Sequence, residues 1–581
     1  MGDSVEYGKI SPTLARAYDT YLESGWEGLS AHVDRHELAG VVAPSDETQP
    51  AHVVVNLLCS PDADLSGLAD AGVSINEGGR RVRTATVPLP ALEQLAEHPG
   101  VEWIGEDEHV ELHLDVAAEK VGLGKYRTRA GTSGKGVIIG IVDTGIDSTH
   151  ADFTGRVQRI WDQTVTGTGV PEGAYGKEYT GADVQTSQDT NGHGTMVAGV
   201  AAGAGSVYRG VAPEADLVVV KSKRKTSDVI NGIRYLARVA REAKKPLVIN
   251  LSLGCGQDPH DGTDALSRAV DEISGPGVVV CCSAGNEGSS PIRAEAEVGR
   301  GETTIPCNYG FYEKYGAFGV YGWYSGKVQI EIAFQAPSGA RTPWQSVITS
   351  GKPYTSHKLD NWDVVLYHMV DPRNRCHYIG VSATPPQNAG KTRSFWKLVL
   401  RGKNFGMATT SHVDVWCTGD VYLAGPGART TMTIAAPGAA YEAITVGAYM
   451  SRKKWTDLNE LDWQHSDYTE DAMAPFSSRG PLRNGNAKPN VAAPGAVIVT
   501  CLSSKITQKP DSEDTPDSTH VVGRGTSMSA PFMAGVVALL LQKEPTLDRD
   551  KILEKLSVRP ESDTKHDQNV WGRGLIDLDP M

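Results

Sequence analysis

The sequence lacks the features that mark membrane proteins and nucleic-acid-binding proteins. Among its 581 residues no run approaches the roughly 18 apolar residues that a membrane-spanning helix needs. Basic residues are in the minority, with 56 Lys and Arg against 70 Asp and Glu, so the formal net charge is −14. Phosphate binding needs a basic surface. We therefore expect neither a membrane nor a nucleic acid as a partner.

Cysteine is scarce and scattered. The eight cysteines include no C-x-x-C pair, so the spacing does not predict a zinc site. Cys281 and Cys282 lie in an apolar run, and we interpret all eight as reduced structural thiols. Disulfides stay an alternative if the protein is exported by an unrecognised route. The segment 1–30 is charged throughout and has no apolar signal core, which predicts a cytoplasmic protein if Met1 is the native start.

Length and pattern predict several domains. Residues 1–48 are polar and weakly periodic, and we interpret them as an N-terminal extension with one or two helices. Residues 49–116 follow the order β-α-β-β-α-β, from a strand at His52–Cys59 to a strand at Val101–Ile104. That order is ferredoxin-like.

Two later stretches, 117–292 and 433–581, alternate apolar runs with helix-like segments. Continuous apolar runs are typical of strands that are buried on both faces, so the fold class is α/β, a parallel sheet with helices on both faces. The runs are Val137–Val142, Leu217–Val220, Leu247–Leu251 and Val278–Cys282.

Residues 293–432 break this rhythm. They are rich in glycine and aromatic residues, and Val328–Phe334 alternates strictly between the two faces of a strand. Turn signals separate further short strands, so we predict an inserted all-β sandwich or jelly roll.

Two short motifs carry an acid and a histidine. Asp143 ends the first apolar run in VDTGID, and ligands gather at the carboxyl ends of parallel strands. His193 lies in NGHGTMVAG, at the start of a predicted helix. Taken singly, Asp143 is equally explained as a turn cap and His193 as a packed structural residue.

Two more motifs carry a serine and an amide. Ser527 lies in GTSMSAP at a predicted helix N-terminus, where unsatisfied N–H groups can stabilise an oxyanion. Its alternative is a plain helix cap. Asn286, in SAGNEG after a buried strand, can donate to a developing negative oxygen, or it is a turn asparagine.

In this chain order and on this α/β pattern, the four motifs resemble those of the subtilisin-like serine proteases (subtilases, peptidase family S8). The resemblance covers about 119–288 and 432–542, with a propeptide-like segment at 51–112. It implies a serine endopeptidase with Ser527 as nucleophile, His193 as general base and Asp143 orienting the histidine. It also implies that Asn286 and the backbone N–H of Ser527 form an oxyanion hole. No catalytic cofactor or metal is implied.

The resemblance further implies polypeptide substrates. Ser252, Leu253 and Gly254 match a strand that pairs with the substrate backbone, and Ala284 and Gly285 help to line the pocket beside it. The small N-terminal domain resembles a propeptide that assists folding and then inhibits the enzyme. We therefore expect a zymogen whose own prodomain is a partner and which cuts itself between about 109 and 117.

The sequence departs from the family in two places. Asp152 matches an acid that binds structural calcium in many members, but the stretch 201–210 is short and nearly without ligands. Calcium needs six or more oxygens, so we expect an ordinary turn residue and no calcium. The β-rich insertion lengthens the chain between His193 and Ser527, and in this architecture the protein resembles the Csp germination proteases.

A basic cluster, KSKRK at 221–225, follows the strand Leu217–Val220. In the family this region borders the subsites upstream of the cut. The cluster is either a solvated loop or a determinant that favours acidic substrates. The acidic run at 106–108, before the expected self-cleavage point, agrees with the second hypothesis.

Three rival functions stay open. A pseudoprotease would lack a triad residue, and all three are present. A peptide ligase or macrocyclase on the same fold would yield a product without the water that hydrolysis adds. A binding module with an attached protease would keep its main function in the insert, which deletion of about 295–430 would reveal.

Overall fold

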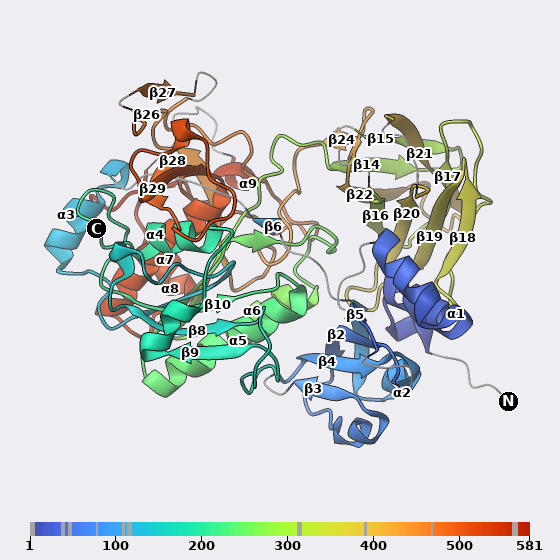
Figure 1. Ribbon diagram of the computed structural model, residues 1–581. Helices are drawn as coiled ribbons and strands as arrows, with labels where there is room; N and C mark the ends of the chain where they lie inside the picture. The colour runs from blue at the N-terminus through green and yellow to red at the C-terminus, as the bar shows by residue number, and fades with distance from the viewer. Residues whose placement is uncertain are drawn as a thin grey trace.

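The computed structural model describes most of the chain. The described residues are 6–36, 41–44, 49–76, 79–106, 111–112, 119–310, 316–387, 392–459, 461–465, 469–559 and 567–581. Three units are visible: a helix-covered sheet, a pair of β-sheets to its side, and a small sheet below that pair (Figure 1). Within the described residues no helix is both long enough and apolar enough to cross a membrane.

The central sheet has 11 strands in the order β30-β31-β28-β25-β13-β11-β7-β10-β8-β9, with β29 paired to β28. Neighbours from β28 to β8 run parallel, as the continuous apolar runs predict. The strands are β7 (Ile138–Asp143), β8 (Val157–Asp162), β9 (Lys177–Thr180), β10 (Asp216–Lys221), β11 (Leu247–Leu251), β13 (Val278–Ser283), β25 (Ile444–Met450), β28 (Val491–Cys501), β29 (His520–Arg524), β30 (Val558–Arg559) and β31 (Leu575–Ile576).

Alternate side chains of the parallel strands enter two separate cores. Ile139 and Ile141 of β7 pack with helices α4 (His193–Ala202) and α7 (Thr526–Lys543). Ile138 and Val142 pack on the other face with α5 (Thr226–Ala243) and α6 (Ala265–Ile273). Both faces of the sheet are therefore covered by helices and shielded from water. This explains why these strands do not alternate between apolar and polar residues. The remaining helices and hairpin of this unit are α3 (Leu123–Ala130), α8 (Arg549–Lys555), α9 (Gln568–Trp571), β26 (Lys454–Thr456) and β27 (Asp462–Gln464).

The small sheet is antiparallel. It contains β1 (Val41–Val42), β2 (His52–Cys59), β3 (Ser74–Asn76), β4 (Val82–Pro88) and β5 (Val101–Glu106). β2 lies between β5 and β4, β4 lies between β2 and β3, and β1 pairs with the start of β2. Helix α2 (Leu92–Glu97) belongs to the same unit.

The first helix does not stand apart from this sheet. α1 (Pro12–His36) buries Leu14, Tyr18 and Leu29 in the same core as β2. Part of the predicted N-terminal extension therefore completes the small domain. The polar, weakly periodic sequence hid this because the residues that face the core gather mainly in 10–19, and the rest of the segment is largely exposed or half-buried.

The small sheet is fixed to α5 and α6. A carboxylate oxygen of Glu272 accepts hydrogen bonds from the backbone N–H groups of Arg81 (3.1 Å) and Val82 (3.0 Å). The other oxygen lies 3.3 Å from the guanidinium of Arg234. Because backbone groups make these contacts, the docking fixes the position of the sheet itself.

The third unit lies in the chain between β13 and β25. It has a seven-stranded sheet, β18-β19-β20-β16-β22-β14-β24, and a four-stranded sheet, β17-β21-β15-β23, and residues from both share one core. The strands are β14 (Arg293–Val298), β15 (Thr303–Tyr309), β16 (Phe318–Tyr324), β17 (Gln329–Gln335), β18 (Tyr354–Leu359), β19 (Trp362–Val370), β20 (His377–Thr384), β21 (Ser394–Lys403), β22 (Ser411–Gly419), β23 (Val421–Leu423) and β24 (Ala428–Arg429).

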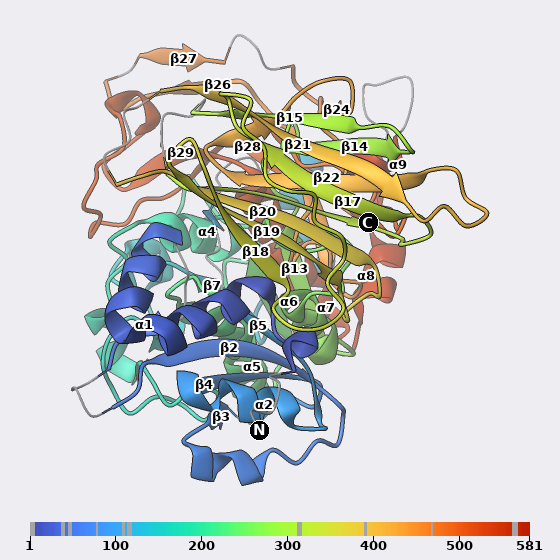
Figure 2. The same cartoon turned by 90° about the vertical axis from the view of Figure 1, so that its right-hand side faces the viewer.

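Helix α1 bridges the small domain and this pair of sheets, next to β18 (Figure 2). The hydroxyl of Tyr354 donates to Asp19 at 2.6 Å, and the Lys352 ammonium lies 3.1 Å from the same carboxylate. A cavity of about 70 Å³ lies where the three units meet, lined by Trp103 and Arg373 among others. The three units therefore contact one another directly.

Candidate active site

Asp143 and His193, which come from separate motifs, are in contact. Asp143 ends β7 and is fully buried. Its Oδ1 lies 2.7 Å from Nδ1 of His193 and also accepts from the backbone N–H of Thr144 at 2.7 Å. A carboxylate can only accept, so the histidine proton is on Nδ1 and Nε2 keeps its lone pair.

A second aspartate holds the start of α4 in place. Asp189 is fully buried and accepts from the backbone N–H groups of Gly192 (2.8 Å) and Thr195 (2.9 Å) and from the Thr195 hydroxyl (2.6 Å). These bonds satisfy N–H groups at the helix N-terminus that have no partner inside the helix. The sequence analysis missed Asp189 because it lies before the N-cap position, Gly192, where a capping side chain would be sought.

The loop after β7 lies directly on the start of α4. A Cβ at Gly194 would stand 2.1 Å from the backbone oxygen of Gly145. The backbone N–H of Gly194 donates to the Thr144 hydroxyl at 2.9 Å. Glycine at 194 is therefore required for the approach that brings Asp143 to His193.

Ser527 is the second residue of α7 and is fully buried. Its hydroxyl donates to the backbone oxygen of Ser252 at 3.3 Å. In return, the Ser252 hydroxyl donates to the backbone oxygen of Ser527 at 2.7 Å. Asn250 of β11 donates to the Ser252 hydroxyl at 2.9 Å. Ser527 is thus fixed against the segment that leads into β12 (Leu253–Gly254). Since α4 and α7 pack on each other, His193 and Ser527 start neighbouring helices.

Asn286 is oriented by the residue before Ser527. Its side-chain oxygen accepts from the backbone N–H and the hydroxyl of Thr526, both at 3.0 Å. The same hydroxyl accepts from the backbone N–H of Gly285 at 3.0 Å. Because Thr526 holds the oxygen of the Asn286 amide, the N–H₂ group of this amide points away from Thr526.

The predicted pocket residues Ala284 and Gly285 continue β13. Gly285 has a φ of +99°, and its oxygen accepts from the backbone N–H of Ser478 at 2.8 Å. A Cβ there would stand 2.8 Å from the Ser478 hydroxyl. The sequence analysis missed the roles of Thr526 and Ser478 because both residues lie far along the chain from the turn that they hold.

The tail of the small domain, which is the segment that follows its last strand, pairs with the predicted substrate strand. β6 (Glu111–Leu112) runs antiparallel to β12, with Leu112 opposite Leu253 and Glu111 opposite Gly254. Most of the expected self-cleavage range, including 113–117, lies outside the described residues. The edge expected to bind a substrate is therefore paired with residues that follow the small domain.

Asp152 lies in a single turn of 3₁₀ helix, Ala151–Phe153, where the sequence predicts a turn residue. It is buried, and its Oδ2 accepts from the backbone N–H of Gly205 at 2.9 Å. The short stretch 201–210 thus closes onto this carboxylate by a backbone hydrogen bond.

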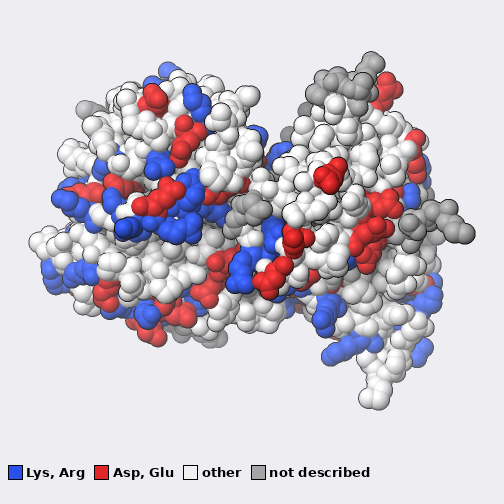
Figure 3. Space-filling view, turned by 90° about the horizontal axis from the view of Figure 1, so that it is seen from below, with Lys and Arg blue, Asp and Glu red and all other residues white. Residues whose placement is uncertain are grey.

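The basic cluster at 221–225 is only partly available to a ligand. Lys221 donates to the backbone oxygen of Gln188 at 2.9 Å and lies 3.5 Å from Asp162. Lys223 and Arg224 are exposed. On the face seen in Figure 3, acidic and basic side chains are intermixed. A local preference for one charge would therefore depend on a few side chains.

Asp147 fixes the loop that follows Asp143. Burial raises the pKa of its carboxyl, but hydrogen bonds donated by Thr149 and Ser504 outweigh this and hold the pKa below its usual value. A lowered carboxyl pKa stabilises the fold at neutral pH, and this contribution is lost as the pH falls.

The sequence matches the model of the "Subtilase family" over residues 134–327 and 355–567. Serine protease AprX of Bacillus subtilis is 24% identical over 513 residues, which cover 85% of this chain and 78% of AprX. Subtilisin E of Bacillus subtilis is 31% identical over 217 residues, or 36% of this chain and 49% of that protein. The matched stretch is thus about half of subtilisin E.

A solved structure of the CspB protease of Clostridium perfringens has the same fold. It superposes with a TM-score of 0.65 at 22% identity and covers 79% of this chain and 95% of that chain. The superposition thus extends beyond the stretch that matches subtilisin E.

The close approach at Gly194 predicts a matched pair of glycine variants. Gly194→Ala should lower the free energy of unfolding by several kcal/mol, because the new Cβ meets a backbone oxygen that cannot move alone. Gly124→Ala, at an exposed position of α3 with nothing within 4 Å of the new Cβ, should be neutral or stabilising by about 0.5–1 kcal/mol. Thermal denaturation compares the two. Equal melting temperatures would contradict the assigned packing.

Proposed function

The chain belongs to the subtilase family of serine endopeptidases, and from this premise we propose that it hydrolyses polypeptides with Ser527, His193 and Asp143. The observation that carries the assignment is the buried 2.7 Å contact between Asp143 and His193, at the start of a helix packed against the helix of Ser527. The parallel sheet with helices on both faces is the subtilisin-like fold.

In the proposed mechanism the Ser527 hydroxyl attacks the scissile carbonyl while Nε2 of His193 takes its proton. Asp143, bonded to Nδ1, holds the imidazole in the required tautomer and stabilises the imidazolium that forms. His193 then protonates the leaving amine, which departs. Water hydrolyses the acyl-enzyme by the same route in reverse and restores the Ser527 hydroxyl. No step needs a cofactor.

We assign the oxyanion hole to the Asn286 amide and the backbone N–H of Ser527. The support is the orientation of Asn286, whose oxygen is held by Thr526. The N–H₂ group is thereby aligned before the substrate arrives. Preorganised donors of this kind stabilise charge that develops only in the transition state.

Asn286→Ala should therefore lower kcat about 10²- to 10³-fold with little change in KM. Thr526→Val keeps the shape of the side chain but removes one of the two hydrogen bonds to the Asn286 oxygen, and we expect a loss of about tenfold, also in kcat. Thr303→Val, in β15, is the control and should leave both constants unchanged. Steady-state kinetics on a peptide substrate measures all three. A pure KM effect would place Asn286 in substrate binding instead.

The small domain with α1 is proposed to be an inhibitory prodomain. Its strand order, β5-β2-β4-β3, supports the ferredoxin-like prediction, and its tail pairs with β12 as an extended substrate would. A third pair in the same register would set residue 113 opposite Ser252, whose oxygen accepts from the Ser527 hydroxyl. We therefore propose that the enzyme is a zymogen that cuts the bond between His113 and Leu114.

The mass of the purified protein tests self-processing. Wild type should yield two fragments, and the larger should begin at Leu114. Ser527→Ala should remain intact, while Ser529→Ala, a serine of the same helix that donates to the Thr526 oxygen, should still be cut. Equal masses for wild type and Ser527→Ala would refute self-cleavage. A cut outside 109–117 would refute the register and leave peptidase activity open.

The remaining domain divisions are proposed on packing. We assign 293–432 to an insert between the catalytic parts 117–292 and 433–581, because residues from its two sheets share one core. A jelly roll is the proposed topology of the insert. We keep the cytoplasm as the proposed compartment, since all eight cysteines are free thiols.

The exposed part of the basic cluster is proposed to favour acidic residues upstream of the cut. Lys223→Gln combined with Arg224→Gln should lower kcat/KM about three- to tenfold for peptides with acids at the second to fourth upstream positions. Peptides with alanine there should be cleaved as before. Profiling a peptide library with wild type and the double variant measures this. The idea fails if wild type shows no acidic preference.

A further inference from the structure

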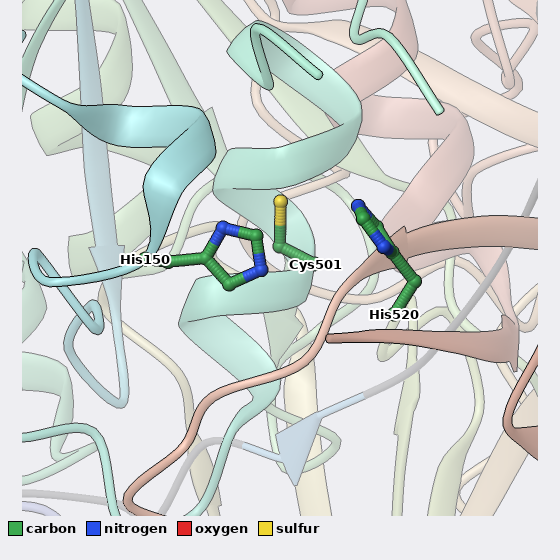
Figure 4. Close-up of side chains that lie close together, drawn as sticks. All are labelled: His150, Cys501 and His520. Atoms are coloured by element: carbon green, nitrogen blue, oxygen red, sulfur yellow. The ribbon is translucent and has the colours of Figure 1, made fainter. Parts of the chain in front are cut away.

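Four potential metal ligands meet in one buried cluster away from the triad. His150 and Asp152 follow β7, Cys501 ends β28, and His520 begins β29. Figure 4 shows both imidazoles and the thiol around a common centre. One ligand atom each of His150, Cys501 and His520 lies within 4.8 Å of the other two. All four residues are buried.

Asp152 contacts the other three. Its Oδ2 lies 3.6 Å from Nε2 of His520 and 3.7 Å from Sγ of Cys501. Its Oδ1 lies 3.7 Å from Nδ1 of His150. Ligand atoms on a tetrahedral zinc, at bond lengths of 2.0–2.3 Å, stand about 3.3–3.7 Å apart. The distances to Asp152 are already of that size.

The imidazoles are turned so that lone pairs face the cluster. Nδ1 of His520 lies 2.9 Å from the Asp517 carboxylate, which fixes the proton there and points Nε2 inward. That Nε2 is buried and has no hydrogen-bond partner in the described structure. A carboxylate behind a histidine is a common second ligand shell of zinc.

His150 follows the same logic. Its Nε2 lies 2.9 Å from the backbone oxygen of Thr519, so the proton is on Nε2 and the lone pair is on Nδ1. That Nδ1 also lies 3.2 Å from the backbone N–H of Asp152, a contact that metal binding would weaken.

We propose that His150, Asp152, Cys501 and His520 form a structural site for a divalent transition metal of the zinc type. One thiolate and one carboxylate balance the two charges of the ion, and binding releases the Cys501 proton to solvent. Imidazole and thiolate favour zinc, whereas calcium and magnesium prefer all-oxygen sites.

A second cluster shows the contrast. Glu295, His412 and Asp414 also lie close together, but Arg293 lies 2.8 Å from Glu295 and also pairs with Asp414. Arg429 lies 2.8 Å from Glu295. The guanidinium groups already supply the positive charge, so this cluster is an ion-pair network that offers a matched control.

The site would fasten four segments of the catalytic unit. Two residues just after α4 donate to Asp152. The backbone N–H of Gly205 donates to the carboxylate at 2.9 Å, and that of Ala204 donates to the backbone oxygen at 3.1 Å. The metal would thus join the loop after β7 to β28, β29 and the far end of the helix that starts with His193. Its role is to hold these segments in place, and it touches no reacting atom.

Cobalt(II) is the probe, because it replaces zinc and is coloured. The full-length Ser527→Ala protein, stripped with a chelator, should bind one equivalent of Co²⁺. The spectrum should show the visible bands of a tetrahedral site and a near-ultraviolet thiolate band, and Zn²⁺ should abolish both. Absence of binding, or an octahedral spectrum without the thiolate band, would overturn the proposal.

Variants assign the ligands. Cys501→Ser should remove the thiolate band, His520→Asn should weaken Co²⁺ binding at least 100-fold, and Asp517→Asn should weaken it about 10- to 100-fold. His412→Gln and Cys417→Ser should match the parent protein. A thiolate band that persists in Cys501→Ser would overturn the assignment.

A second measurement uses no ligand variants, so it does not depend on whether a variant folds. Zn²⁺ should raise the melting temperature of the stripped full-length protein, and Ca²⁺ at the same concentration should not. If neither ion raises it, or if Ca²⁺ raises it equally, the proposal fails. Self-processing and peptidase assays are independent, so an active enzyme without metal would leave the proposed function intact.

Discussion

The site depends on one buried contact, the bond between Asp143 and His193. It joins the carboxyl end of β7 to the first residue of α4, so any shift of the helix on the sheet would break it. Asp189 holds the helix start, and Gly194 lets the β7 loop approach. A parallel sheet buried on both faces places both elements at one edge of the sheet. The position of His193 beside Asp143 is thus a consequence of core packing.

The pairing of β12 suggests how the chain can block its own proposed substrate site. β12 is the strand proposed to bind an extended substrate, and in the structure β6 of the same chain pairs with it. Because the small sheet is fixed to α5 and α6 through Glu272, the tail is held at a high local concentration over this edge. In the proposed zymogen, inhibition and substrate binding would therefore use the same hydrogen bonds, and cleavage of the tail would be the step that separates them.

Sequence reasoning worked where a signal is local. The run Val137–Val142 predicted β7, the segment Val229–Lys244 predicted α5 almost in full, and the short motifs pointed to residues that the fold brings into contact. It failed where the signal is spread along the chain. The packing of α1 on the small sheet depends on a few apolar residues in a polar segment. Ser478 acts only through a turn far away in sequence.

Spacing rules are weakest where ligands come from distant strands. The absence of a C-x-x-C pair argued against a zinc site, yet Cys501 lies beside Asp152 because β28 and the β7 loop meet in space. A rule based on neighbours in the sequence cannot see such a cluster. The proposed metal would hold the far end of α4, and Asp189 holds the near end, where His193 begins. A helix fixed at both ends would keep the imidazole in place for the 2.7 Å bond to Asp143, which is the contact that the proposed catalysis needs.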